Sequence, residues 1–162
     1  YKNIMELLKG RDIKIVVDAT KELLVKSLPY GPFLIKPNNY ELGEIFGVRL
    51  TTRSSVIPYA KKLQNMGARN VLVSMAGEGA VLVSDDGRVI DAPAPEGKLI
   101  NGVGAGDSMV AGFMAGYLAR HDYNHAFCMG VASGSASAFS ENLATKEEIE
   151  KVYKTIVLEE KV

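Results

Sequence analysis

The sequence predicts an α/β fold with a mostly parallel sheet and antiparallel strands at one edge. Short continuous apolar runs at 13–17 and 33–35 suit strands that are buried on both faces of a parallel sheet. A helical pattern separates these runs, as expected for a right-handed crossover from strand to helix to strand. Turn sequences at 76–79 and 85–87 join later apolar runs over short distances, which predicts hairpins and therefore the antiparallel edge.

The composition is that of one globular domain. Of 162 residues, 47% are hydrophobic, and 19 basic and 19 acidic side chains give a formal net charge of zero. This balance argues against nucleic acid or an anionic membrane as a partner. No apolar run approaches the roughly 18 residues of a membrane span, so we expect a cytoplasmic protein. The chain starts at Tyr1 within a helical pattern, so we also expect a piece of a longer protein.

The first half of the chain alternates helical and strand patterns. Gly10 suits the C-cap of a first helix, Thr20 suits the N-cap of a second helix that Pro29 ends, and Gly67 suits a helix stop. In order, the expected elements are a helix at 1–9, a strand at 13–17, a helix at 20–28, a strand at 33–35, a helix that opens near Asn38 and ends at Gly47, and a helix at 52–66.

The second half begins with hairpin strands and ends in helices. Small residues recur four apart in two successive helical patterns, which predicts that these two helices pack closely. Thr145 and Glu148 form a capping-box pattern at the start of a last helix. The expected elements are strands at 71–75, 80–84 and 89–90, a helix with Asp107 in its first turn, and helices at 124–139 and 145–158. The small residues are Gly104, Ser108, Gly112 and Gly116 in the first row and Ala126, Gly130, Gly134 and Ala138 in the second.

Polar residues follow the strand at 33–35 and open the next helix. Lys36, Asn38 and Glu41 therefore belong to the carboxyl end of a parallel strand, where open α/β sheets bind ligands. Asn38 and Glu41 are three residues apart and share a helix face, so their oxygens suit a Mg2+ ion carried by a nucleotide. The alternative is a capping box, with Asn38 as the N-cap and Glu41 as the third helical residue.

The stretch Asn101–Ser108 has the two properties of a group-transfer site. Its alternating glycines allow a ligand to come close to the backbone, and the helix behind them starts with free amides that attract phosphate. The same field keeps the Asp107 carboxylate ionised and able to accept a proton. No Gly-Lys-Ser/Thr follows, which excludes a Walker motif, and Asp107 stands where a dinucleotide fingerprint has its last glycine.

The string Gly104-Ala105-Gly106-Asp107 resembles the signature of the ribokinase (PfkB) family of carbohydrate kinases. The motifs Lys36-Pro37-Asn38-x-x-Glu41 and Ser74-x-x-Gly77-x-Gly79 agree with that family in type and order. The segments 132–140 and 144–149 look like the 1-phosphofructokinase branch and the neighbouring tagatose-6-phosphate kinases. The resemblance implies a ribokinase-like three-layer α/β/α sandwich, of which residues 1–162 are a partial domain, the carboxyl-terminal, nucleotide-binding part of a single kinase domain.

The resemblance also implies residue roles. Asp107 would be the general base, and the amides of Gly104, Ala105 and Gly106 would form an anion hole. Asn38 and Glu41 would organise Mg2+ through water, and Lys36 would contact a nucleotide phosphate. The further residues expected at the ATP site are Ser74, Met75, Ala76, Gly77, Glu78, Gly79, Gly106, Asp107, Ser133 and Ser137.

Two features of the turn after Ser74 leave the ATP-site interpretation open there. The glycines at 77 and 79 also suit a plain hairpin. Ala76 stands where related kinases usually have glycine, and its methyl group would narrow the approach of a phosphate.

The implied function is ATP-dependent phosphorylation of a sugar phosphate, fructose 1-phosphate to fructose 1,6-bisphosphate. ATP and Mg2+ would be the cofactors and the sugar phosphate the partner, and the intact protein is expected to be a homodimer. The alternatives are phosphorylation of tagatose 6-phosphate, or a non-catalytic nucleotide-binding fragment that lacks the sugar-binding half.

Overall fold

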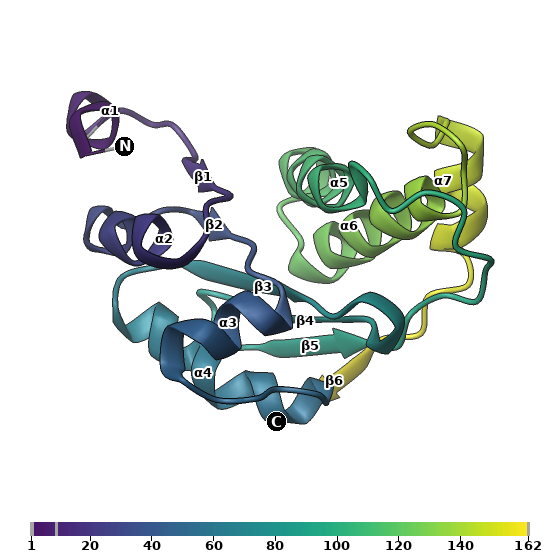
Figure 1. Cartoon of the computed structure of the whole chain (residues 1–162). Coiled ribbons are helices and arrows are strands. Elements are labelled where there is room, and N and C mark those ends of the chain that lie inside the picture. The colour runs from purple at the N-terminus through teal and green to yellow at the C-terminus, as the bar shows by residue number, and fades with distance from the viewer. Residues whose placement is uncertain (1, 9, 162) are drawn as a thin grey trace. The chain divides into compact units, whose positions relative to one another are not determined.

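The computed structural model describes residues 2–8 and 10–161 (Figure 1). The chain folds as two compact units. The first unit consists of the residues up to Met75 together with Val81–Val89, and the second consists of Ala76–Ala80 and Ile90–Lys161. The first unit carries the predicted magnesium residues, and the second carries the glycine loop with its helix.

Helices of the first unit begin at Thr52 and end at Gly47, as the sequence predicts, whereas Thr20 stands at the predicted N-cap without a side-chain capping hydrogen bond. Thr52 caps the longest of them through a capping box, in which the Ser55 amide donates to Thr52 Oγ1 at 3.2 Å. Gly47 ends the preceding helix in the left-handed conformation, with φ at 66°. Tyr1 and Lys9, the ends of the first predicted helix, lie outside the described residues. The elements are α1 (Lys2–Leu8), α2 (Lys21–Ser27), the 3-10 turn η1 (Leu28–Tyr30), α3 (Asn39–Phe46) and α4 (Arg53–Asn65).

The sheet has the strand order β1-β2-β3-β4-β5-β6. Strands β1, β2 and β3 are parallel, with Val16 opposite Leu34 and Leu34 opposite Asn70, which confirms the predicted parallel part. The links from β3 to β4 and from β4 to β5 are too short for a crossover, so these pairs are antiparallel, as predicted. The strands are β1 (Val16–Val17), β2 (Leu34–Ile35), β3 (Asn70–Ser74), β4 (Ala80–Val83), β5 (Val89–Ala92) and β6 (Glu159–Lys161).

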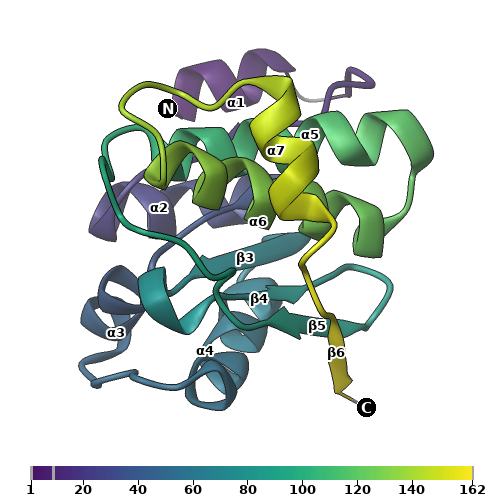
Figure 2. The same cartoon turned by 90° about the vertical axis from the view of Figure 1, so that its right-hand side faces the viewer.

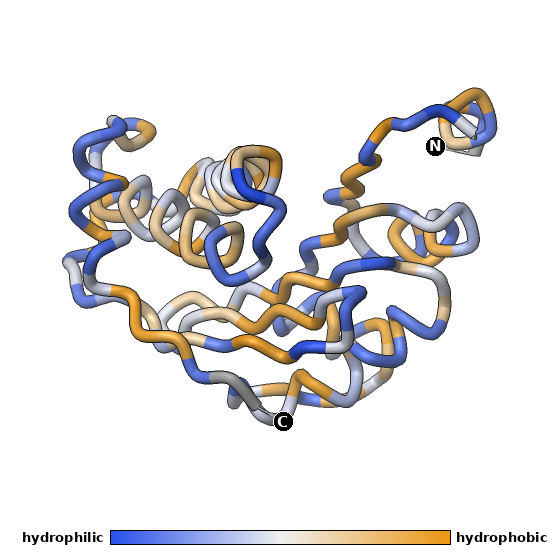
Figure 3. The backbone as a smooth tube through the Cα atoms, turned by 180° about the vertical axis from the view of Figure 1, so that it is seen from behind, coloured by the Kyte–Doolittle hydropathy of each residue, from blue (hydrophilic) through white to orange (hydrophobic). Residues whose placement is uncertain are grey.

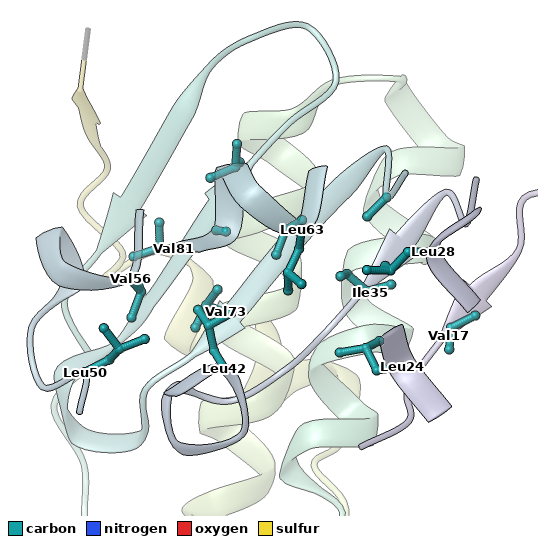
Figure 4. Packing of buried hydrophobic residues seen from close by; sticks show 14 of the residues in the cluster. Val17, Leu24, Leu28, Ile35, Leu42, Leu50, Val56, Leu63, Val73 and Val81 are labelled. Carbon is teal, nitrogen blue, oxygen red and sulfur yellow. The ribbon is translucent and has the colours of Figure 1, made fainter. Parts of the chain in front are cut away.

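A hydrophobic core fills the first unit. Side chains from α2, α3 and α4, such as Leu24, Leu42 and Leu63, meet strand side chains such as Ile35 and Val73, and all five are fully buried (Figure 4). Figure 3 shows the matching run of hydrophobic residues along these strands. This burial supplies the main stabilisation of the unit and fixes the strands whose carboxyl ends carry the polar motif.

The second unit is built around α5 (Ala105–Arg120), α6 (Tyr123–Ala138) and α7 (Lys146–Tyr153), which lie together in Figures 1 and 2. The predicted close packing of α5 and α6 is confirmed. A Cβ atom placed on Gly112 would come within 2.5 Å of the Met129 carbonyl oxygen, and one on Gly134 within 3.0 Å of the Ala105 carbonyl oxygen. Only glycine therefore lets the two helix backbones approach this closely at Gly112.

The last helix is shorter than predicted. It begins at the expected capping box but ends at Tyr153 rather than near residue 158, and β6 follows it. Three β-branched residues, Thr155, Ile156 and Val157, follow the C-cap residue Lys154, and their low helix propensity favours the observed end. Among residues 2–8 and 10–161, no helix is both long and apolar enough to cross a membrane.

Candidate functional site

The carboxyl ends of β1, β2 and β3 bring together polar residues from separate segments. Lys36 follows β2 and is almost fully buried, at 8% exposure, and its Nζ lies 3.5 Å from Asp18 Oδ2. Asp18 follows β1 in the same way that Lys36 follows β2. The sequence pattern showed its position at a strand end, but only the structure shows that it pairs with Lys36. Because the Asp18 side chain is 37% exposed, the pair opens to solvent on one side.

Asn38 and Glu41 form the capping box that the sequence left as the alternative to a metal site. The Glu41 amide donates to Asn38 Oδ1 at 2.8 Å, and the Asn38 amide donates to Glu41 Oε2 at 2.9 Å. The box fixes both side chains at the start of α3. The second carboxylate oxygen, Glu41 Oε1, takes no part in it. Glu41 Oε1 is therefore left for a cation, whereas Asn38 Oδ1 already accepts the Glu41 amide and has only its second lone pair for a further partner.

Ser74, a residue expected at the ATP site, lies beside this motif. Its amide donates to the Pro37 carbonyl oxygen at 3.2 Å, and Ser74 forms a parallel bridge with Asn38. Met75, the next predicted ATP-site residue, is instead buried in the hydrophobic core of the first unit, at 3% exposure. Its side chain is therefore occupied by packing, and only its backbone is left for a ligand.

The turn after Met75 is the 3-10 turn η2 (Ala76–Glu78), whose residues are exposed. The Gly79 amide donates to the Ala76 carbonyl oxygen at 3.1 Å. A Cβ atom on Gly79 would come within 2.8 Å of the Ala94 amide nitrogen, so this glycine is required by the fold itself. Gly77 has open space around it, and its amide is the better candidate for a phosphate contact.

The glycine loop ends in a left-handed residue at the start of α5. Gly104 has φ at 77° and ψ at −2° and serves as the N-cap, with no side chain capping the helix. The Ser108 amide is the first to enter the helical pattern, donating to the Gly104 carbonyl oxygen at 2.9 Å. The amides of Gly106 and Asp107 thus precede the regular hydrogen bonds of a 16-residue helix. Such a helix start is suited to an anion such as phosphate.

Asp107 lies in the first turn of α5 with its side chain exposed. Its exposure leaves it accessible to the hydroxyl group of a second substrate. The structure thus places amides that suit an anion and an exposed carboxylate within one turn of helix.

Ser133 and Ser137 lie on α6 and are almost fully buried, at 4% and 3% exposure. Ser133 packs against Gly112 of α5. Ser137 is hydrogen-bonded within the second unit, where its hydroxyl donates to Ser108 Oγ at 2.9 Å. These contacts give both serines a role in packing, in addition to the ATP contact predicted for them. Asn101, at the start of the glycine loop, makes two side-chain hydrogen bonds that sequence reasoning missed.

Comparison with known proteins agrees with these motifs. The model of the pfkB family of carbohydrate kinases matches residues 1–150. A 1-phosphofructokinase from Bacillus subtilis is 47% identical over 152 residues, which cover 94% of this chain and 50% of that protein. A D-tagatose-1-phosphate kinase from Bacillus licheniformis is 31% identical over 152 residues, which cover 93% of this chain and 50% of that protein. The chain spans about half the length of these curated relatives.

A solved structure confirms the predicted fold. A Staphylococcus aureus protein to which phosphofructokinase activity is ascribed matches with a TM-score of 0.91 and 40% identity, covering 98% of this chain and 51% of that one. The family model, the sequence relatives and the structure all agree with the glycine loop and the mixed sheet. The chain therefore belongs to the pfkB family of carbohydrate kinases.

Proposed function

We propose that this chain carries the nucleotide-binding and proton-accepting part of an ATP-dependent kinase that converts fructose 1-phosphate to fructose 1,6-bisphosphate. The observation that carries the proposal is the start of α5, where an uncapped glycine loop and Asp107 share one helical turn. The similarity to a 1-phosphofructokinase at 47% identity supports this choice of substrate.

In the proposed reaction, the Asp107 carboxylate accepts the proton of the acceptor hydroxyl. The oxygen of that hydroxyl forms a bond to the γ-phosphorus of ATP, and the bond between this phosphorus and the bridging β–γ oxygen breaks to release ADP. The amides of Gly104, Ala105 and Gly106 stabilise the negative charge on the phosphoryl group in transit. Positioning and electrostatic stabilisation of this kind supply most of the catalysis in phosphoryl transfer.

The residues at the start of α3 fit a magnesium ion in donor type. Asn38 offers an amide oxygen and Glu41 a carboxylate oxygen outside the capping box, and both atoms are hard ligands of the kind that Mg2+ prefers. A bound Mg2+ would neutralise charge on the nucleotide phosphates. Lys36, held by Asp18, would add a fixed positive charge at the same strand ends.

The replacement Glu41→Gln separates the two functions of Glu41. Glutamine retains the capping box, since its side-chain oxygen accepts from the Asn38 amide, but it has lost the negative charge. We expect α3 and its stability to be retained while the Mg2+ concentration for half-maximal nucleotide binding rises. The measurement is a calorimetric titration with ATP at several Mg2+ concentrations. An unchanged Mg2+ dependence would count against Glu41 as a ligand.

The replacement Asp107→Asn tests the general base. We expect turnover to fall by about two to four orders of magnitude, the usual contribution of a general base, while ATP binds as before. Turnover is measured by a coupled assay for ADP with fructose 1-phosphate, using this chain alone and together with the amino-terminal half of the Bacillus subtilis relative. Near-normal turnover in the variant would remove Asp107 from this role.

The wild-type chain in the same assays separates the candidate functions. Faster turnover with tagatose 6-phosphate than with fructose 1-phosphate would favour the other substrate. The similarity to a D-tagatose-1-phosphate kinase keeps a tagatose phosphate open as substrate, although that sugar carries its phosphate on a different carbon atom. ATP binding without turnover on either sugar would favour a nucleotide-binding fragment. The homodimer expected of the intact protein stays a prediction, to be measured by sedimentation.

A further inference from the structure

The carboxyl-terminal end of α6 holds the glycine loop through a set of hydrogen bonds. The amides of Ile100 and Asn101 both donate to the Ala138 carbonyl oxygen, at 2.9 and 3.1 Å. The Asn101 side chain adds two further bonds, because its Nδ2 donates to the Glu141 carbonyl oxygen at 3.1 Å and its Oδ1 accepts from the Val103 amide at 3.0 Å. The start of the loop is thus tied to residues that lie about 40 positions later in the chain.

Ser137 forms the second part of this support. Its hydroxyl donates to Ser108 Oγ at 2.9 Å and accepts from the Ala144 amide at 3.1 Å. Ser108 is the residue next to Asp107 on α5. One buried hydroxyl group therefore joins the first turns of α5, the end of α6 and the segment that follows α6.

The segment after α6 also packs on the glycine loop. A Cβ atom on Gly104 would lie 2.9 Å from Leu143 Cδ2, so Leu143 occupies the space that a side chain at Gly104 would need. Leu143 precedes Ala144, whose amide donates to Ser137 Oγ. Through its bond to the Ala144 amide, Ser137 therefore also helps to fix Leu143, which lies over Gly104, the N-cap of α5.

We infer that Ser137 is a positioning residue, which acts through Ser108 and Ala144 to hold the Gly104–Asp107 turn in the shape needed to bind phosphate. Ser137 is 3% exposed and both hydrogen bonds of its hydroxyl group lie within the second unit, so this supporting role is separate from the ATP contact predicted for it. This inference rests on the proposed function in one respect, namely that the Gly104–Asp107 turn binds a phosphate group. The hydrogen bonds themselves make it testable on the free chain.

The replacement Ser137→Ala removes both hydrogen bonds at once. The Ala144 amide then lacks its acceptor, and Ser108 Oγ lacks its donor, so we expect the turn to become less ordered. In ¹H–¹⁵N spectra of the free chain, the amide signals of Gly106 and Asp107 should shift or broaden. ATP with Mg2+ should bind about five- to tenfold more weakly in calorimetry, the effect of roughly one lost hydrogen bond.

Two further variants distinguish positioning from general destabilisation. Ser135→Ala removes a hydroxyl from the same helix but retains the Ser135 backbone carbonyl, which accepts from the Phe139 amide at 3.0 Å. This variant should leave both readouts unchanged. Ser108→Ala removes only one of the two bonds, so its effect should be smaller. The double variant at Ser108 and Ser137 should equal Ser137→Ala alone, because both changes break the same connection.

The outcomes separate this inference from the proposed function. Unshifted Gly106 and Asp107 signals in Ser137→Ala would overturn the positioning role whether or not ATP binds. Shifted signals in Ser137→Ala but not in Ser135→Ala would support it, even if the wild-type chain binds no ATP and the proposed function fails. Additive losses in the double variant would also overturn it, since Ser137 would then act independently of Ser108.

Discussion

The close approach of α5 and α6 predicts that Gly112→Ala destabilises the chain. The new Cβ atom would lie 2.5 Å from the Met129 carbonyl oxygen, about 0.9 Å short of ordinary contact, and it would also meet the Ser133 side chain. Because a backbone carbonyl cannot rotate away, the helices must separate, at a cost of about 1–3 kcal/mol. The higher helix propensity of alanine stabilises the folded chain by about 1 kcal/mol, so the net decrease in the free energy of unfolding is as much as about 2 kcal/mol.

This loss is measured by thermal unfolding followed by circular dichroism. For a protein of this length, a loss of about 2 kcal/mol lowers Tm by about 4–8 °C. Gly130→Ala is the matched control, because its Cβ would meet the Met109 carbonyl oxygen at 3.0 Å, a deficit that small shifts relieve. The Tm of Gly130→Ala should stay within about 2 °C of wild type, because the higher helix propensity of alanine offsets the destabilisation from this tight contact. A Gly112→Ala protein as stable as the control would refute the close packing.

Three further predictions follow from backbone strain and from pKa shifts. Ala76 has φ at 47°, so Ala76→Gly should relieve the left-handed conformation and raise the free energy of unfolding by about 0.5–1 kcal/mol; an unchanged urea midpoint would contradict this. Burial raises the pKa of the Cys128 thiol to about 11, so iodoacetamide at pH 8 should react about a hundredfold more slowly than with the unfolded chain, and equal rates would disprove it. Burial, and to a smaller extent Arg120, lowers the pKa of His125, whose Nδ1 lies 2.8 Å from the Tyr153 hydroxyl. The unfolded chain then binds the proton more readily, so Tm should fall as the pH drops through about 6.5, and should fall less in His125→Asn.

The sequence predicted best those features that depend on a few neighbouring residues. Both capping boxes at Asn38 and Thr145 form as the three-residue spacing indicates. The predicted helix stop at Gly47 adopts the positive φ that a C-cap glycine needs. These interactions close within one turn, so local chemistry decides them without the rest of the fold.

The parts that sequence reasoning missed depend on residues far apart in the chain. The ion pair of Asp18 with Lys36 exists only because β1 and β2 are neighbours in the sheet. The bond of Ser137 to Ser108 needs the close packing of α5 on α6. A serine on an apolar helix face gives no sign in the sequence of which residue it will bond to, so this hydrogen bond could not be predicted, while the ATP contact of Ser137 stays a prediction. The early end of α7 is an exception, because its cause is local: three β-branched residues close to Tyr153 outweigh a favourable helix start.

The capping box at α3 has a further consequence for how tightly a cation is held. A free glutamate loses side-chain freedom when it binds an ion, and this ordering costs about 0.5–1.5 kcal/mol. In this chain the Asn38 amide already holds Glu41 Oε2 in place, so the carboxylate is ordered before any ion arrives. A cation that binds Glu41 Oε1 would therefore meet a rigid ligand. The Glu41 side chain loses its conformational entropy when the helix forms, so this loss would not reduce the affinity for the cation.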